Sequence, residues 1–91
     1  MSVTYDDIVS AQKAQDDVIR KTSLTFSDTF TEITGSSVYL KNEFEQKTGS
    51  FKLRGAYYKI KTLSTEERKN GVVAASAGNH AQGVAYASVL E

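Results

Sequence analysis

A strand, a turn and the beginning of a helix follow one another at residues 72–83, which read Val-Val-Ala-Ala-Ser-Ala-Gly-Asn-His-Ala-Gln-Gly. Residues 72–75 are apolar without alternation, which is typical of a strand buried on both faces of a parallel sheet. Residues 81–90 continue as a helix that is apolar on nearly every side. Gly83 and Ala87, four residues apart, would let this helix pack very close to a neighbour. The stretch predicts an α/β fold, a parallel sheet with flanking helices.

The turn itself, Ser76-Ala77-Gly78-Asn79-His80, is a candidate anion site. Ligands of open α/β sheets bind where a parallel strand ends and a helix begins, because the free N–H groups of the helix attract a carboxylate or phosphate. Gly78 permits a tight turn and a close backbone approach, while Ser76 and Asn79 add a hydroxyl and an amide. Taken singly, each residue is better explained by a structural role than by anion binding: as a helix cap, as a turn residue or as a polar group with a hydrogen-bond partner. As a group at this position, the five favour an anion site.

The second informative stretch is residues 48–56, which read Thr-Gly-Ser-Phe-Lys-Leu-Arg-Gly-Ala. Ser50 can cap a helix that leaves Lys52 in the first turn, where free N–H groups and the helix dipole disfavour a second positive charge. Arg54 adds another nearby cation, and burial would favour the neutral amine that Schiff-base chemistry requires. The alternative is an ordinary solvated lysine, and residues 48–56 alone favour that alternative.

Other helices and strands are predicted from caps and periodicity. Thr4 and Asp7 resemble a helix start, and Ser64-Thr65-Glu66-Glu67 offers a capping box for a short helix closed by Asn70-Gly71. We expect a strand and a short helix between Phe26 and Gly35, and a strand over 37–41. At about 100° per residue, a helix over 50–63 gathers one apolar face, with Lys52 at its edge: Leu53, Ala56, Tyr57, Ile60 and Leu63.

Composition excludes several classes of protein. The chain has 91 residues, eleven basic and eleven acidic side chains, no cysteine and one histidine, His80. No basic run marks a nucleic-acid partner, and no apolar stretch marks a membrane span. The absence of cysteine argues against disulfides and is compatible with the cytoplasm. A protein-only metal site is not expected.

Together the two stretches resemble the signature blocks of threonine ammonia-lyases (threonine dehydratases), which belong to the fold-type II family of pyridoxal-phosphate enzymes. The approach at 41–47, Lys-Asn-Glu-Phe-Glu-Gln-Lys, matches as well, except that the family usually has Asn or Asp where this chain has Phe44. The resemblance runs from roughly Tyr5 to Glu91, and two blocks in the right order and spacing are highly specific.

The resemblance implies a role for each site residue. Lys52 would hold pyridoxal 5'-phosphate covalently, remove the substrate Cα proton and help to expel the β-hydroxyl. Phe51 would pack against the cofactor ring, and Asn79 would bond to its phenolic oxygen. The substrate carboxylate would be held mainly by backbone N–H groups of Ser76, Ala77, Gly78, Asn79 and His80. The substrate would be threonine or serine, giving 2-oxobutanoate or pyruvate plus ammonia.

Close relatives include serine racemases, in which a serine acid/base stands at the position of Ala77. A methyl group cannot transfer a proton, so the resemblance favours elimination over racemisation. O-acetylserine sulfhydrylases fit poorly, because they have an Asn-Pro element before the lysine and this chain has no proline.

The family's glycine-rich phosphate loop and its partner of the pyridine nitrogen do not occur in these residues. We therefore expect an N-terminal portion of a longer chain, with 1–50 in the larger domain and 51–91 opening the smaller one. The parent would be a homo-oligomer, and a biosynthetic (isoleucine) or catabolic role stays open. Two further readings are a non-catalytic fragment that binds a partner and a small phosphate- or nucleotide-binding module.

Overall fold

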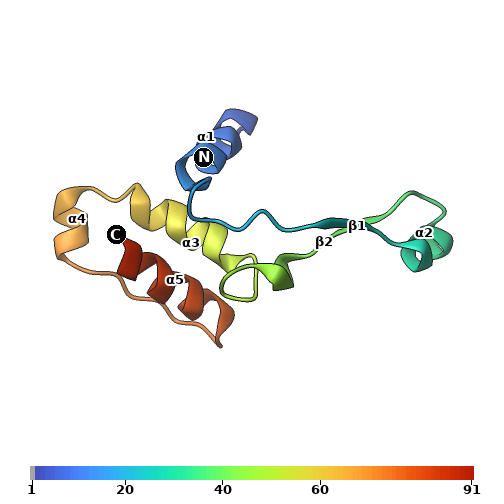
Figure 1. The fold of residues 1–91 in the computed structure, drawn as a ribbon. Coiled ribbons are helices and arrows are strands. Elements are labelled where there is room, and N and C mark those ends of the chain that lie inside the picture. Colours follow the sequence, from blue (N-terminus) through green and yellow to red (C-terminus); the bar gives the residue numbers. More distant parts are fainter. Residues whose placement is uncertain (1) are drawn as a thin grey trace.

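The computed structural model describes residues 2–91, which form helices and one pair of strands (Figure 1). In chain order the elements are α1 (Tyr5–Gln15), β1 (Leu24–Phe26), α2 (Asp28–Thr34), β2 (Tyr39–Lys41), the 3-10 helix η1 (Glu43–Glu45), α3 (Lys52–Lys61), α4 (Thr65–Lys69) and α5 (Asn79–Leu90). The molecule is elongated, 51 × 29 × 26 Å. Helices α3, α4 and α5 make a body with α1 above it, and β1, α2 and β2 extend away from this body.

The helix starts predicted at Thr4 and Ser64 are confirmed, whereas the N-cap of α3 is Phe51 and not the predicted Ser50. The hydroxyl of Thr4 accepts a hydrogen bond from the backbone N of Asp7 at 3.2 Å, and Asp7 Oδ2 accepts one from the backbone N of Thr4 at 2.8 Å. This reciprocal capping box lowers the pKa of the Asp7 carboxyl, chiefly through the backbone hydrogen bond from Thr4. Ser64 and Glu67 form the same arrangement at the start of α4. Gly35 ends α2 in the left-handed conformation, as expected.

The core lies between α3 and α5. It consists of Leu53, Tyr57 and Ile60 from the predicted apolar face of α3 and Ala87 from α5, with Val18, Ile19, Leu63 and Val84 packed around them. Gly83 permits this packing: a Cβ at that position would lie 3.2 Å from the backbone N of Leu53 and from the carbonyl carbon and oxygen of Lys52. The predicted close approach through Gly83 and Ala87 is therefore confirmed.

The expected parallel sheet is not formed by residues 2–91. Their only sheet is the antiparallel pair β1–β2, in which Leu24, Thr25 and Phe26 face Lys41, Leu40 and Tyr39. Residues 72–75 are not assigned to a strand and are exposed, not buried on both faces. The physical reason is pairing: within the described part of the chain, no other segment hydrogen-bonds to their backbone. None of the helices in residues 2–91 is long and apolar enough to span a bilayer.

The contact at Gly83 predicts the effect of adding one methyl group. Gly83→Ala places Cβ against backbone atoms that cannot rotate away, so we expect a loss of about 1–3 kcal/mol in the free energy of unfolding. The matched control is Gly55→Ala, since Gly55 lies inside α3 with nothing within 4 Å of its Cβ position. That variant should gain about 0.5–1 kcal/mol from helix propensity. Urea denaturation of both variants tests the packing, and equal effects at the two positions would contradict it.

Candidate active site

The structure brings Lys52 and the turn at 76–80 to one open pocket. Its volume is about 460 Å³, and its lining consists of Lys52 together with Ala75, Ser76, Ala77, Gly78, Asn79 and His80. Twenty-odd residues of chain separate the two segments, and the packing of α3 on α5 through Gly83 joins them. Every residue that the resemblance assigns to the lysine or the carboxylate therefore lines the same space.

Lys52 is the first residue of α3, as expected. Phe51 occupies the N-cap position without a side-chain capping bond, and the hydroxyl of Ser50 accepts a long hydrogen bond, 3.4 Å, from the backbone N of Lys52. The Lys52 side chain is exposed, and its Nζ lies 5.2 Å from the centre of the Phe51 ring. This distance allows a cation–π contact. Phe51 is 58% exposed and does not line the pocket, so its expected stacking on a cofactor ring stays a prediction.

The turn presents free backbone donors to the pocket. The first backbone hydrogen bond of α5 runs from Gln82 N to Gly78 O at 3.0 Å. Among residues 2–91 the N–H groups of Asn79, His80 and Ala81 consequently have no backbone acceptor. The side chain of Ser76 stabilises the turn, because its hydroxyl accepts a hydrogen bond from Gly78 N at 3.0 Å. Free N–H groups at a helix N-terminus suit a carboxylate.

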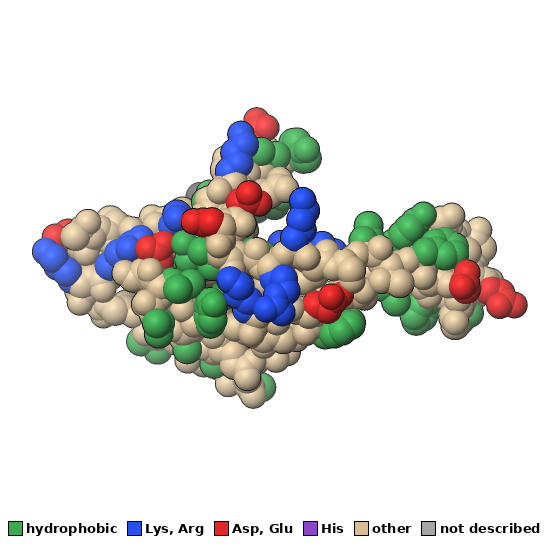
Figure 2. Space-filling view, in the orientation of Figure 1, with side chains coloured by type: hydrophobic (Ala, Val, Ile, Leu, Met, Phe, Trp, Pro, Cys, Tyr) green, Lys and Arg blue, Asp and Glu red, His purple; other side chains and the backbone are tan. Residues whose placement is uncertain are grey.

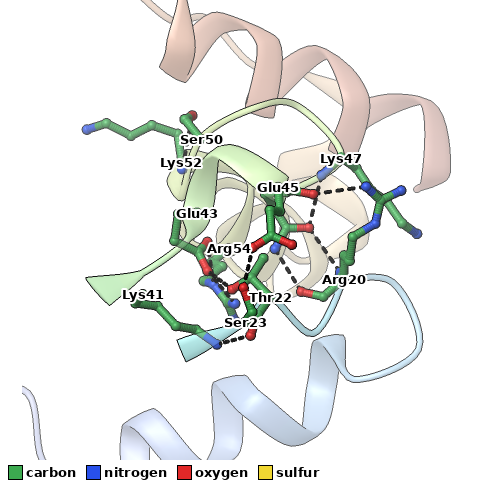
Figure 3. Close-up of polar contacts among 11 residues, drawn as sticks. Arg20, Thr22, Ser23, Lys41, Glu43, Glu45, Lys47, Ser50, Lys52 and Arg54 are labelled. Carbon is green, nitrogen blue, oxygen red and sulfur yellow. Dashed lines mark hydrogen bonds and ion pairs between the residues drawn. The ribbon is translucent and has the colours of Figure 1, made fainter. Parts of the chain in front are cut away.

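A polar network that the sequence did not predict anchors the start of α3 (Figure 3). Arg54 donates from Nε to Glu43 Oε2 at 2.9 Å and from Nη2 to Glu43 Oε1 at 2.8 Å. Thr22 donates its hydroxyl proton to the same carboxylate at 2.5 Å. These contacts, and above all the hydrogen bond from Arg54, lower the pKa of Glu43 from 4.5 to about 2.

This ion pair corrects the electrostatic role expected for Arg54. The cation was expected to act on Lys52, but Glu43 offsets its charge, and Figure 3 shows the Lys52 side chain extending away from the pair. Arg54 is thus an anchor for the helix. The sequence held no signal for it, because eleven residues separate the partners and neither helical nor strand periodicity relates them.

Gln46 provides a second anchor. This residue is 3% exposed, and its side-chain amide pairs with the backbone of Arg20 in both directions: Oε1 accepts from Arg20 N and Nε2 donates to Arg20 O, each at 2.9 Å. Lys41 adds a bond from Nζ to the carbonyl of Thr22 at 2.7 Å. The segment from Lys41 to Gln46, which leads towards Lys52, is therefore attached to Arg20 and Thr22 by several hydrogen bonds.

The residues present fit pyridoxal phosphate at its reactive end. A primary amine, which can condense with an aldehyde, faces the same space as a row of N–H donors suited to an amino-acid carboxylate. Residues 2–91 bring no group of three His, Cys, Asp or Glu side chains into an arrangement that could hold a metal ion.

Comparison with known proteins agrees with this chemistry. Residues 16–90 match the model of the family described as "Pyridoxal-phosphate dependent enzyme". An L-threonine ammonia-lyase of Thermotoga maritima is 59% identical over 88 residues, covering 97% of this chain and 22% of the relative. Among solved structures, serine racemase from Dictyostelium discoideum superposes with a TM-score of 0.86 at 45% identity, covering 97% of this chain and 29% of that chain. A threonine deaminase from T.th. superposes with a TM-score of 0.79 at 39% identity, covering 97% of this chain and 31% of that chain.

The chain therefore belongs to the family of pyridoxal-phosphate-dependent enzymes. The similarity to threonine ammonia-lyases that residues 48–56 and 76–83 predicted is confirmed. The chain spans between a fifth and a third of the length of these relatives.

The pKa of Glu43 predicts how this anchor depends on pH. A carboxyl whose pKa falls from 4.5 to about 2 on folding stabilises the fold above pH 4.5, and this contribution is lost as the pH falls towards 2. Glu43→Gln should therefore cost about 2 kcal/mol of unfolding free energy at pH 7 and progressively less below pH 4. The side chain of Glu43 is 15% exposed and that of Arg54 36%, so solvent partly screens the pair and the expected cost is smaller than the full pKa shift would give.

Urea denaturation of both proteins at pH 7 and pH 3 measures the difference. Glu66→Gln is the control, because Glu66 pairs with Lys69 on the surface and its loss should cost less than about 0.5 kcal/mol. A Glu43→Gln cost that is the same at both pH values would refute the ion-pair explanation.

Proposed function

We propose that this chain carries the lysine and carboxylate-binding part of a pyridoxal-phosphate-dependent ammonia-lyase that acts on threonine or serine. The observation that carries the proposal is the common pocket: Lys52 and the turn at 76–80 line one space, in a chain similar to threonine ammonia-lyases over nearly its whole length. Full activity is assigned to the longer protein of which such a chain forms a part.

Each residue has a task in this proposal. When bound, pyridoxal phosphate supplies the electron sink that makes the substrate Cα proton acidic. Lys52 would hold the cofactor through Nζ, and as a free amine it would accept the Cα proton. The backbone N–H groups of Asn79 and His80 hold the carboxylate, which fixes the orientation of Cα. Asn79 would hold the ring through its phenolic oxygen, and Phe51 would pack on the ring.

The second candidate is racemisation, since a solved serine racemase is among the similar structures. Racemisation needs an acid on the face of Cα opposite the lysine. Ala77 lines the pocket in the turn and carries only a methyl group, which cannot donate a proton. Elimination remains possible with Lys52 as the single base, and this difference favours the ammonia-lyase.

The longer protein would complete the fold. We propose that residues 72–75 form a strand of a parallel sheet there, because they are apolar and their backbone has no hydrogen-bond partner among residues 2–91. Residues 1–50 would belong to the larger domain and 51–91 to the smaller one. A homo-oligomer and a cytoplasmic location are further parts of this proposal, the latter compatible with the absence of cysteine.

Chemical trapping tests the assignment of Lys52. The purified chain is mixed with pyridoxal phosphate and reduced with borohydride, which converts the C=N link at the amine into a stable C–N bond. Peptide mapping should place most of the label on Lys52, because only this lysine lines the pocket with the free N–H groups. Lys52→Ala should remove that label and leave the labelling of other lysines unchanged.

The internal controls are Lys47 and Lys59, which are exposed and near in sequence. Label that is spread equally over Lys47, Lys52 and Lys59 would make Lys52 an ordinary surface amine. Competition by threonine but not by a nucleotide would separate the proposed function from a nucleotide-binding module.

A further inference from the structure

Helix α3 carries Lys52 but has no side-chain cap at its start. Helices α1 and α4 begin with reciprocal capping boxes, whereas Phe51, the N-cap of α3, makes no side-chain hydrogen bond. The hydroxyl of Ser50 reaches only the backbone N of Lys52, at 3.4 Å. Capping contacts normally fix how a chain enters a helix. The orientation of the first turn of α3 therefore depends on other contacts.

The paired hydrogen bonds between Arg54 and Glu43, here called the fork, provide such a contact. Arg54 is the third residue of α3, and it donates from Nε and Nη2 to the two carboxylate oxygens of Glu43. Two parallel bonds fix the plane of the guanidinium, which an ion pair through a single nitrogen would not do. Glu43 is itself held, since its Oε1 accepts a hydrogen bond from the hydroxyl of Thr22. The fork therefore attaches the first turn of α3, in one orientation, to residues outside the helix.

The fork also determines where Lys52 points. At about 3.6 residues per turn, positions two apart in a helix lie about 200° apart around its axis, so Lys52 and Arg54 project from nearly opposite sides of α3. Leu53, between them, is fully buried in the core. Figure 3 shows this arrangement: Arg54 reaches Glu43, and the Lys52 side chain extends away from the pair. With Arg54 held by Glu43, Lys52 lines the pocket formed with the turn at 76–80.

An ion pair alone would not have this effect, because charges of both signs are spread over the molecule. Figure 2 shows Lys and Arg side chains (blue) and Asp and Glu side chains (red) in several separate places. The pair of Lys69 with Glu66, for example, joins two exposed side chains through one nitrogen. The fork differs from it in two respects: its side chains are more buried, and its two hydrogen bonds have a fixed direction.

We propose that Glu43, acting through Arg54, is a positioning residue for Lys52: the fork sets the rotation of α3 at which the Lys52 amine faces the carboxylate-binding turn at 76–80. This role rests on the proposed function, in which Lys52 is the reactive amine. Glu43 does not line the pocket, so it acts on the reaction only by orienting the helix that carries the lysine.

Labelling with pyridoxal phosphate and borohydride tests this role in the full 91-residue chain. The quantity measured is the ratio of label on Lys52 to label on Lys59, which lies on the same helix and serves as an internal standard. Glu43→Gln should lower this ratio about tenfold, because the amine no longer faces the turn. A second measurement needs no cofactor. The nuclear Overhauser contact between the α-protons of Gly83 and the amide proton of Leu53, whose nitrogen lies close to Gly83, should weaken in the same variant.

Ile60→Val is the control for stability. It removes a methyl group from the core on the same helix, beyond the first turn, so it lowers the stability of the fold and leaves the fork intact. Both the label ratio and the Overhauser contact should keep the values of the unsubstituted chain.

A double-mutant cycle tests whether the two side chains act as a unit. Arg54→Gln should lower the label ratio as much as Glu43→Gln does, and the double variant should lose no more than either single variant. Far-ultraviolet circular dichroism verifies that each variant is folded. If Glu43→Gln unfolds, Arg54→Gln replaces it in both measurements, since Glu43 then keeps its hydrogen bond from Thr22.

Three results would overturn the positioning role: an unchanged label ratio after loss of the fork, an equal loss in Ile60→Val, or a double variant whose loss is the product of the two single losses. Equal labelling of Lys52 and Lys59 in the unsubstituted chain would instead refute the proposed function, and the Overhauser contact would then decide the positioning role by itself.

Discussion

The close approach of α3 and α5 at Gly83 is the contact on which the pocket depends. Gly83 lies one turn after the free N–H groups of α5, and the backbone that it touches belongs to Lys52 and Leu53. The lysine and the anion-binding turn are therefore held together by main chain against main chain, a contact with no rotatable side chain to absorb movement. A larger residue at 83 would separate the two halves of the pocket even if both helices stayed intact.

The polar network around Glu43 and Gln46 positions the same helix, α3, at its first turn. Glu43 accepts a hydrogen bond from Arg54, and Gln46 donates one to the backbone of Arg20. These bonds attach the loop before Lys52 to the rest of the molecule and fix the position of the first turn of α3 relative to α5. Apolar packing alone would allow α3 to slide or rotate on α5, because burial has no direction. Hydrogen bonds at 2.8–2.9 Å do have direction, and they set which residue of α3 faces the turn.

Local signals in the sequence account for what could be predicted. Caps such as Thr4 with Asp7, the apolar face of α3 and the small residues of α5 all act over three or four positions, and all appear as expected. The pairing of the lysine stretch with the turn came from the family resemblance. The bonds of Glu43 to Arg54 and of Gln46 to Arg20 join residues 11 and 26 positions apart. Neither helical nor strand periodicity relates such pairs, and so the sequence did not predict that Glu43 offsets the charge of Arg54.

The contrast between helices and strands explains the remaining difference between prediction and structure. A helix satisfies its backbone within its own residues, so all the expected helices form in 91 residues. A strand must find its hydrogen-bond partners elsewhere in the chain, and β1 finds β2 because only α2 and a short turn separate them. Residues 72–75 have the composition of a buried strand, but no segment among residues 2–91 hydrogen-bonds to their backbone, and they are exposed. Their apolar sequence is thus typical of a strand whose hydrogen-bond partners are not among residues 2–91.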